Sequence, residues 1–198
     1  MSDPQTSLAP TPSQTVGPFF GYALPFTGGD HLVPPGREGA IRLTGTVYDG
    51  DGQPVPDALI ELWQADADGT VSQEQGSRDR DGWTFTGFGR APVDPNGRYT
   101  FTTVTPGATE PGAAPFFTLT VFARGLLQHL FTRAYLPDVD PGSEPFLSGL
   151  PADRAATLVC GRDEHGYTFD IHLQGPGETV FLDYGSDADH GSRAAGTD

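Results

Sequence analysis

Cysteine, basic residues and long apolar runs are all scarce in this chain of 198 residues. Cys160 is the single cysteine, so no disulfide can form within the chain and no cysteine cluster can hold a metal. Eleven Lys and Arg stand against 26 Asp and Glu, and the formal charge of −15 repels nucleic acid and anionic membrane surfaces. No run approaches about 18 apolar residues, and the beginning of the chain lacks the basic start and apolar centre of a signal peptide. We therefore expect a cytoplasmic protein without nucleic-acid or membrane partners.

Glycine and proline are abundant instead, with 27 and 19 residues. They interrupt the sequence every few residues, which leaves no room for long helices and favours many short strands joined by turns. The length suits one domain with a substantial core and is too short for two full domains with a linker. The composition therefore predicts a single all-β domain.

Strand patterns recur along most of this domain. In the first of them Ile41, Leu43, Gly45 and Val47 alternate with polar residues, which is the pattern of a half-buried strand. The seven predicted strands are Ile41–Tyr48, Ala58–Gln64, Arg98–Val104, Phe116–Arg124, Leu130–Leu136, Tyr167–Leu173 and Thr179–Asp183. Seven short strands at this spacing predict a two-sheet β-sandwich, and one short helix is expected from Pro151 to about Val159.

Three regions follow from these patterns. Residues 1–38 form an extended N-terminal arm without periodicity, residues 39–184 form the sandwich, and residues 185–198 are expected to be a disordered tail. The arm contains apolar residues that would be unfavourable in water, so we expect it to lie on another surface. Four phenylalanines are expected to contribute to an interface with a partner chain: Phe19, Phe20, Phe116 and Phe117.

Two motifs are more specific than the strand patterns. The chain reads TPSQTVGPFF from Thr11 to Phe20, and LIELWQAD from Leu59 to Asp66. With these motifs at this spacing, the chain resembles the intradiol ring-cleaving dioxygenases. The resemblance implies a prealbumin-like β-sandwich. Taken alone, the opening from Gly45 to Leu62 also resembles prealbumin-like binding modules that are not enzymes.

The ferric site of that family is missing from this sequence. The family binds Fe(III) through two tyrosines and two histidines, because a hard ferric ion favours phenolate oxygen and accepts imidazole nitrogen. One tyrosine position falls within Ala65–Phe88, which contains no tyrosine, and the other follows Pro106–Gly107, where Ala-Thr-Glu stands instead. Phe116 and Thr118 occupy the two histidine positions, and Ala113 replaces a family arginine.

The other histidines and tyrosines do not rebuild this site. The five histidines, His31, His129, His165, His172 and His190, have no close His-x-His or His-x3-His pairing. None of the six tyrosines, Tyr22, Tyr48, Tyr99, Tyr135, Tyr167 and Tyr184, stands at a family ligand position. We therefore expect no metal site in this chain.

A family frame without its ligands resembles the metal-free alpha branch of the intradiol dioxygenases. Three later segments support that branch: Val121–Gly125, His129–Arg133 and Gly175–Asp183. The resemblance implies a hetero-oligomer in which an iron-bearing beta subunit holds Fe(III). It also implies that the assembly cleaves protocatechuate with O2 to 3-carboxy-cis,cis-muconate. Two alternatives are a homo-oligomeric intradiol dioxygenase acting on another catechol with its own iron, and a non-enzymatic prealbumin-like binding module.

The resemblance also implies that four residues contribute to the partner's substrate pocket: Thr15, Gly17, Pro18 and Arg124. Glycine permits close approach of backbone to a flat ring, proline stiffens the arm, and arginine presents several donors to anionic oxygen. Arg124 also fits a solvated cation or an ion pair at a strand end, and Arg133 is a weaker candidate. Glu61, Asp66 and Asp170 are expected to cap turns or pair with neighbours.

Overall fold

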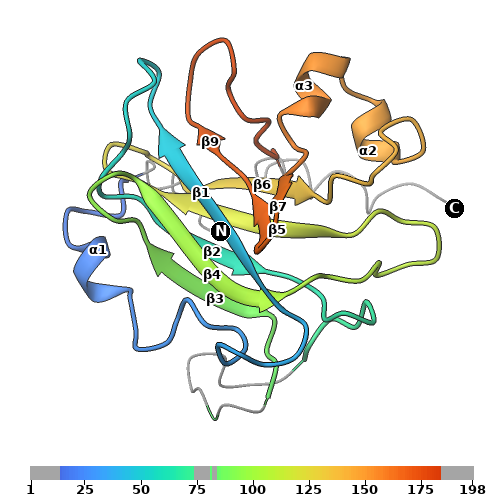
Figure 1. The fold of residues 1–198 in the computed structure, drawn as a ribbon. Helices are drawn as coiled ribbons and strands as arrows, with labels where there is room; N and C mark the ends of the chain where they lie inside the picture. The colour runs from blue at the N-terminus through green and yellow to red at the C-terminus, as the bar shows by residue number, and fades with distance from the viewer. Residues whose placement is uncertain (1–13, 74–80, 82–83, 184–198) are drawn as a thin grey trace, which may run out of the picture.

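The computed structural model of the chain describes residues 14–73, 81 and 84–183. These residues form a sandwich of two β-sheets (Figure 1). The strands are β1 (Ala40–Tyr48), β2 (Leu59–Trp63), β3 (Phe88–Pro92), β4 (Arg98–Val104), β5 (Phe116–Phe122), β6 (Leu130–Tyr135), β7 (Gly161–Asp163), β8 (Gly166–Thr168) and β9 (Ile171–His172). The predicted all-β sandwich is confirmed.

One sheet has the strand order β4-β1-β8-β7, with β9 paired to β1, and the other has the order β3-β2-β5-β6. Strands β8 and β9 run parallel to β1, whereas all pairs of the four-stranded sheet are antiparallel. The facing sides of the two sheets supply one hydrophobic core, in which Leu43, Val47, Ile60, Leu62, Phe101, Phe117, Leu119 and Val121 are fully buried. The predicted alternation in β1 is therefore confirmed at Leu43 and Val47.

The last two predicted strands differ from the structure. The segment Tyr167–Leu173 divides into β8 and β9 because the Asp170 carboxylate accepts the Thr46 N–H at 2.8 Å, which interrupts the backbone ladder with β1. Thr179–Asp183 forms no strand, and its β-bridge is an isolated one from Leu182 to Phe131. Strands β3 and β7 were not predicted.

Three short helices are present in the described residues, where one was expected: α1 (Phe20–Ala23), α2 (Pro145–Ser148) and α3 (Ala152–Ala156). The predicted helix is α3. It ends before Val159 because the chain turns there to meet the end of β6, where the Cys160 N–H donates to the Tyr135 carbonyl at 2.9 Å. Figure 1 shows α2 and α3 together, on the opposite side of the sandwich from α1. No helix within the described part of the chain is long and apolar enough to cross a membrane.

The N-terminal arm closes one side of the sandwich. The Arg90 N–H of β3 donates to the Gly29 carbonyl at 2.7 Å, and the Leu32 N–H donates to the Thr102 carbonyl of β4 at 2.8 Å. The arm therefore crosses between the edge strands of the two sheets and satisfies exposed edge groups of both. Because the arm contains α1, it is not extended throughout. Residues 1–13 and the predicted tail lie outside the described residues, and the division into three regions remains a prediction.

The four phenylalanines expected at an interface have different environments. Phe20 and Phe117 are buried within this chain, so the expectation is wrong for them. The Phe116 side chain is partly buried against the cluster of α2 and α3. Phe19, by contrast, is 73% exposed, and Tyr22 in α1 is 87% exposed. The most exposed aromatic rings of the described residues therefore lie on and beside α1, and Trp63 of β2 is a further exposed ring.

Candidate functional site

The three predicted arm residues lie just before α1. Thr15 and Pro18 are exposed, and the Gly17 N–H donates to the Thr15 hydroxyl at 3.3 Å. Gly17 has φ of +79°, a conformation that residues with a side chain rarely adopt, and a Cβ built there meets nothing within 4 Å. Within this chain, glycine is therefore required by the backbone conformation and not by a close neighbour.

Arg124 follows the end of β5. Its Nε lies 3.0 Å from the Asp57 Oδ2 in the connection between β1 and β2, and its side chain is 74% exposed. An exposed ion pair of this kind contributes little to stability. Arg124 thus forms the strand-end ion pair of the alternative interpretation, and the Arg124 guanidinium remains accessible to solvent.

The side-chain contacts of the arm are with the middle and the beginning of β3, whereas Arg124 follows the end of β5. Leu59 of β2 pairs with Pro92 at the end of β3 and with Phe122 at the end of β5. The arm contacts β3 through Arg90, two residues before Pro92, and Arg124 lies two residues after Phe122. Among the described residues, no hydrogen bond or ion pair links Arg124 to Thr15, Gly17 or Pro18.

The positions that hold iron in the family lie toward the other end of the same sheet. Phe116 and Thr118 line a cavity of about 220 Å³ together with Trp63 of the neighbouring strand. The other lining residues are Gln64, Ala65, Val71, Ser72, Thr86, Gly107, Thr109, Ala114 and Pro115. The Gln64 amide donates to the Ala65 and Val104 carbonyls and accepts from the Thr103 hydroxyl, so it is fully used in holding the adjacent backbone.

The residues at this cavity do not fit a ferric ion. The described lining residues offer hydroxyl, amide and apolar groups, without phenolate, imidazole, carboxylate or thiolate. The family holds Fe(III) through phenolate and imidazole ligands, and these described lining residues supply neither. Within the described residues, no group of three His, Cys, Asp or Glu side chains is arranged to hold a metal. No reaction step is therefore assigned to a metal in this chain.

Arg133 stands beside that cavity, directly opposite Thr118 in the register of β5 and β6. Its guanidinium carbon lies 4.4 Å from the centre of the Phe116 ring and its Nη1 donates to the Tyr135 hydroxyl at 3.2 Å. Burial raises the pKa of Tyr135, and Arg133 opposes that rise, so the phenol is a neutral acceptor for the guanidinium near neutral pH. Arg133 is thus engaged in packing within the chain.

Sequence reasoning missed an ion pair on the outer face of the sheet. Glu61 was expected to pair with a neighbour, and its partner is Arg90 of the unpredicted strand β3. The Arg90 Nε donates to Glu61 Oε1 at 2.8 Å, and its Nη1 donates to the Leu24 carbonyl of the arm at 2.7 Å. Asp66 and Asp170 accept backbone N–H groups, as expected. The alternation of side chains along β2 could have indicated that Glu61 needs a partner on the outer face. It could not have identified Arg90 as that partner.

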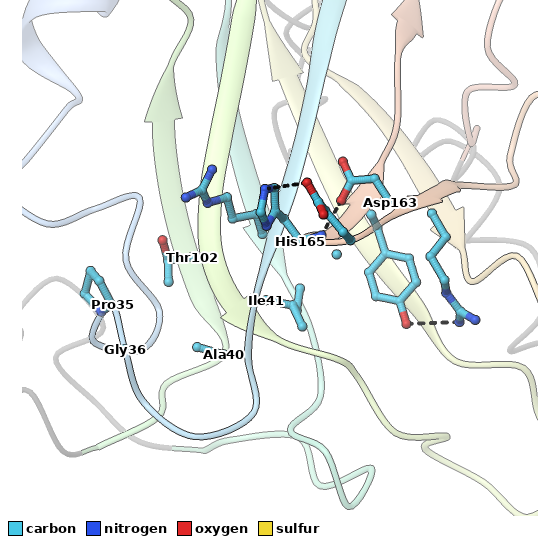
Figure 2. Close-up of a pocket in the computed structure, with 12 residues that line it drawn as sticks. Pro35, Gly36, Ala40, Ile41, Thr102, Asp163 and His165 are labelled. Atoms are coloured by element: carbon cyan, nitrogen blue, oxygen red, sulfur yellow. Dashed lines mark hydrogen bonds and ion pairs between the residues drawn. The ribbon is translucent and has the colours of Figure 1, made fainter.

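A larger surface pocket of about 560 Å³ lies elsewhere. Figure 2 shows Pro35 and Gly36 of the arm on one side of it, and Asp163 and His165 near the turn between β7 and β8 on the other. It is lined by basic and acidic side chains, among them Arg42 and Glu164, and the exposed His165 Nε2 lies 3.4 Å from Glu164 Oε1. None of the four predicted site residues lines this pocket, so it is separate from the candidate site.

Comparison with known proteins places this frame in a family. A family model described as "Dioxygenase" matches residues 17–115. The protocatechuate 3,4-dioxygenase alpha chain of Burkholderia cepacia is 40% identical over 197 residues, covering 90% of this chain and 99% of the relative. The chain therefore belongs to the intradiol dioxygenases.

Within that family the similarity points to one kind of chain. The protocatechuate 3,4-dioxygenase alpha chain of Pseudomonas putida is 38% identical, covering 89% of this chain and 98% of the relative. The beta chain from Burkholderia cepacia is 34% identical over 155 residues, covering 68% of this chain and 64% of the beta chain. The predicted resemblance to the protocatechuate 3,4-dioxygenase alpha chain is confirmed.

Solved structures give the same fold. The dioxygenase domain of a carbohydrate-binding fusion protein from Streptomyces sp. SirexAA-E matches with a TM-score of 0.57 and 25% identity, covering 84% of this chain and 99% of that domain. Catechol 1,2-dioxygenase from Acinetobacter sp. ADP1 matches with a TM-score of 0.51 and 21% identity, covering 72% of this chain and 55% of the enzyme. The second match supports the fold alone.

Proposed function

We propose that this chain is the iron-free alpha subunit of a cytoplasmic protocatechuate 3,4-dioxygenase. In this proposal a beta subunit holds the Fe(III), and the hetero-oligomer cleaves protocatechuate with O2 to 3-carboxy-cis,cis-muconate. The chain is an enzyme subunit that is active only with its partner. Its contribution is to the shape and charge of the partner's substrate pocket.

One observation carries this proposal: the frame of the family's metal site is kept while its ligand positions hold other residues. Phe116 and Thr118 face a cavity in the expected place on β5, beside Trp63 of the family's Trp-Gln motif. A homo-oligomeric dioxygenase would need its own ferric ligands there. A simple binding module would not account for alpha-chain similarity along nearly the whole sequence.

The arm and Arg124 are the groups with which the chain would act on substrate. Thr15, Gly17 and Pro18 lie on an exposed segment, where backbone can pass close to a flat ring. Arg124 has an accessible guanidinium that can donate to the substrate's carboxylate or ring oxygens, directly or through water. The exposed rings of Phe19 and Tyr22 beside this segment support burial against the beta subunit.

Co-expression with the beta chain tests the proposal. The two chains should co-purify, the complex should contain iron, and it should consume O2 with protocatechuate, whereas this chain alone should lack both iron and activity. The same oxygen measurements with catechol and hydroxyquinol separate the substrate classes. Iron-dependent activity of this chain alone would favour the homo-oligomeric enzyme, and failure to associate with any beta chain would favour the binding module.

A further inference from the structure

Arg90 connects the body of the sandwich to the arm through its side chain and its backbone. The side-chain Nη1 donates to the Leu24 carbonyl at 2.7 Å, and the backbone N–H donates to the Gly29 carbonyl at 2.7 Å. A Cβ built on Gly29 would lie 2.7 Å from the Arg90 carbonyl, so the arm passes as close to β3 as glycine allows. The Phe26 ring stacks on Phe88 with centroids 6.3 Å apart, and the Arg90 guanidinium lies 5.9 Å and 5.6 Å from these two rings.

Helix α1 depends on contacts of this kind. It has four residues, no side-chain cap at its start, and no charged residue in its first or last turn. Such a short helix is not stable by itself, because the free-energy cost of nucleating a helix exceeds the gain from one turn of hydrogen bonds. Leu24 is its C-terminal cap residue, so the Arg90 guanidinium satisfies a carbonyl at the end where a positive charge is favourable.

Glu61 fixes the direction of the Arg90 side chain. Both Nε and Nη2 of Arg90 donate to Glu61 Oε1, and the side chains are only 14% and 15% exposed. A buried ion pair is weak support for stability, because two apolar residues of similar size often serve the fold as well. The pair does, however, hold Nη1 in one place, where it meets a carbonyl 66 residues away in sequence.

We propose that Arg90, oriented by Glu61, is a positioning residue for ring cleavage, because it fixes α1 and thereby the segment Thr15–Pro18 immediately before it. This inference rests on the proposed function, in which that segment walls the partner's pocket. It assigns Arg90 no contact with the substrate. Loss of the anchor should therefore weaken substrate placement and leave the beta subunit's iron and the chemical step in place.

The test uses the complete alpha-beta complex. The informative variant is the double substitution Arg90→Met with Glu61→Met, because it removes the bond to Leu24 without leaving an unpaired buried charge. Hydrogen exchange at the backbone amides of Tyr22, Ala23 and Leu24 should become about tenfold faster. KM for protocatechuate should rise about tenfold, with kcat, iron content and complex size close to wild type.

Two further variants separate anchoring from general damage. Arg90→Lys keeps the positive charge beside Glu61. Its compact ammonium cannot bond Glu61 and the Leu24 carbonyl together as the planar guanidinium does. KM for protocatechuate should therefore lie between the values of wild type and the double variant. Arg154→Gln is the matched control, because Arg154 also pairs with a carboxylate and donates to a carbonyl, both of Glu178, on a segment remote in sequence from the arm. It should leave KM and arm exchange unchanged.

Failure of this inference can be distinguished from failure of the proposed function. Unchanged arm exchange in the double variant overturns the anchoring role, even if Gly17→Val still lowers activity and the arm therefore still walls the pocket. Faster arm exchange with wild-type KM overturns the positioning role. If Gly17→Val is then also fully active, the proposed wall itself is wrong.

Discussion

Two regions of the outer face of the four-stranded sheet differ in what their polar groups do. At the centre of this face, Glu61 and Arg90 form a nearly buried ion pair that reaches a carbonyl of the arm. At one end, Trp63, Phe116 and Thr118 line a cavity whose described walls carry no ionisable group. The backbone register of β2 and β5 runs unbroken between the two regions. The same sheet thus supports an attachment at its centre and an uncharged cavity at one end.

This difference shows how a fold can be kept while its chemistry changes. Strand pairing fixes where a side chain stands, whereas the identity of that side chain decides whether a ferric ion can bind. Replacement at Phe116 and Thr118 leaves the core on the opposite face untouched, because Phe117 and Leu119 alternate with them and remain fully buried. The residues at the ligand positions can therefore change without disturbing the core that holds the two sheets together.

The largest effect is expected at the arm. Gly17→Val places a branched side chain at φ of +79° and into the space where the proposed function puts the substrate. We expect kcat/KM for protocatechuate in the alpha-beta complex to fall about a hundredfold, because small displacements of bound substrate are costly. Iron content and complex size should remain as in wild type.

Gly36→Val is the matched control for that substitution. Gly36 has φ of +86°, and its Cβ position is equally open, but it lies in the later part of the arm beside the separate surface pocket. It imposes similar backbone strain without obstructing the proposed wall. Equal losses of activity in the two variants would mean that strain in the arm, and not substrate contact, explains the result.

A smaller effect is expected for Arg124→Leu. Removing a charge-assisted bond to an anionic substrate should raise KM by about tenfold, corresponding to about 1.4 kcal/mol. Steady-state kinetics of the purified complex measure this change. Asp57→Asn is the control, because it removes the ion-pair partner at 3.0 Å while keeping the guanidinium. A rise in KM for Asp57→Asn and none for Arg124→Leu would contradict a role of Arg124 toward substrate.

A still smaller effect is expected inside the core, away from both regions of the outer face. Burial raises the pKa of the Cys160 thiol to about 12. Since an unfolded thiol ionises near pH 9, the folded state holds a proton that the unfolded state has lost between pH 9 and pH 12. The associated stability is complete below pH 9 and is lost progressively above it, by about 1 kcal/mol near pH 10.

Denaturant unfolding at pH 8 and pH 10 measures this contribution. The loss of unfolding free energy should be about 1 kcal/mol greater for wild type than for Cys160→Ala, which has no thiol to ionise. An equal loss in both proteins would show that the thiol is not held protonated by the fold.

The sequence predicted the strands whose local pattern agrees with their burial. Strand β4 has the predicted bounds, and β1 begins one residue early, because alternating residues face one core. Strand β3 was missed because Gly89 and Pro92 weaken its local signal, although its pairing with β2 is complete. The absence of periodicity predicted the arm, and the family motifs predicted the pocket role of Arg124 and the missing ligands. The contact between Arg90 and Leu24 could not be predicted, because 66 residues separate its partners and no local pattern joins them.

The smallest effect is expected at the cavity, where restoring two histidines should not bring ferric iron binding. Phe116→His combined with Thr118→His restores the two imidazoles that the family carries at these positions on β5. Both side chains should enter the cavity, because Phe116 and Thr118 already line it and share one face of the strand. Two neutral imidazoles without a phenolate do not make a site for hard Fe(III), and histidine pairs favour softer divalent ions. Isolated wild type and double variant should therefore both lack stoichiometric iron and phenolate-to-iron colour, as measured by iron analysis and visible spectra beside the beta subunit. Burgundy, iron-loaded protein from either chain would show that ligands outside the described cavity residues complete a ferric site, and would remove the contrast between the two regions of the sheet.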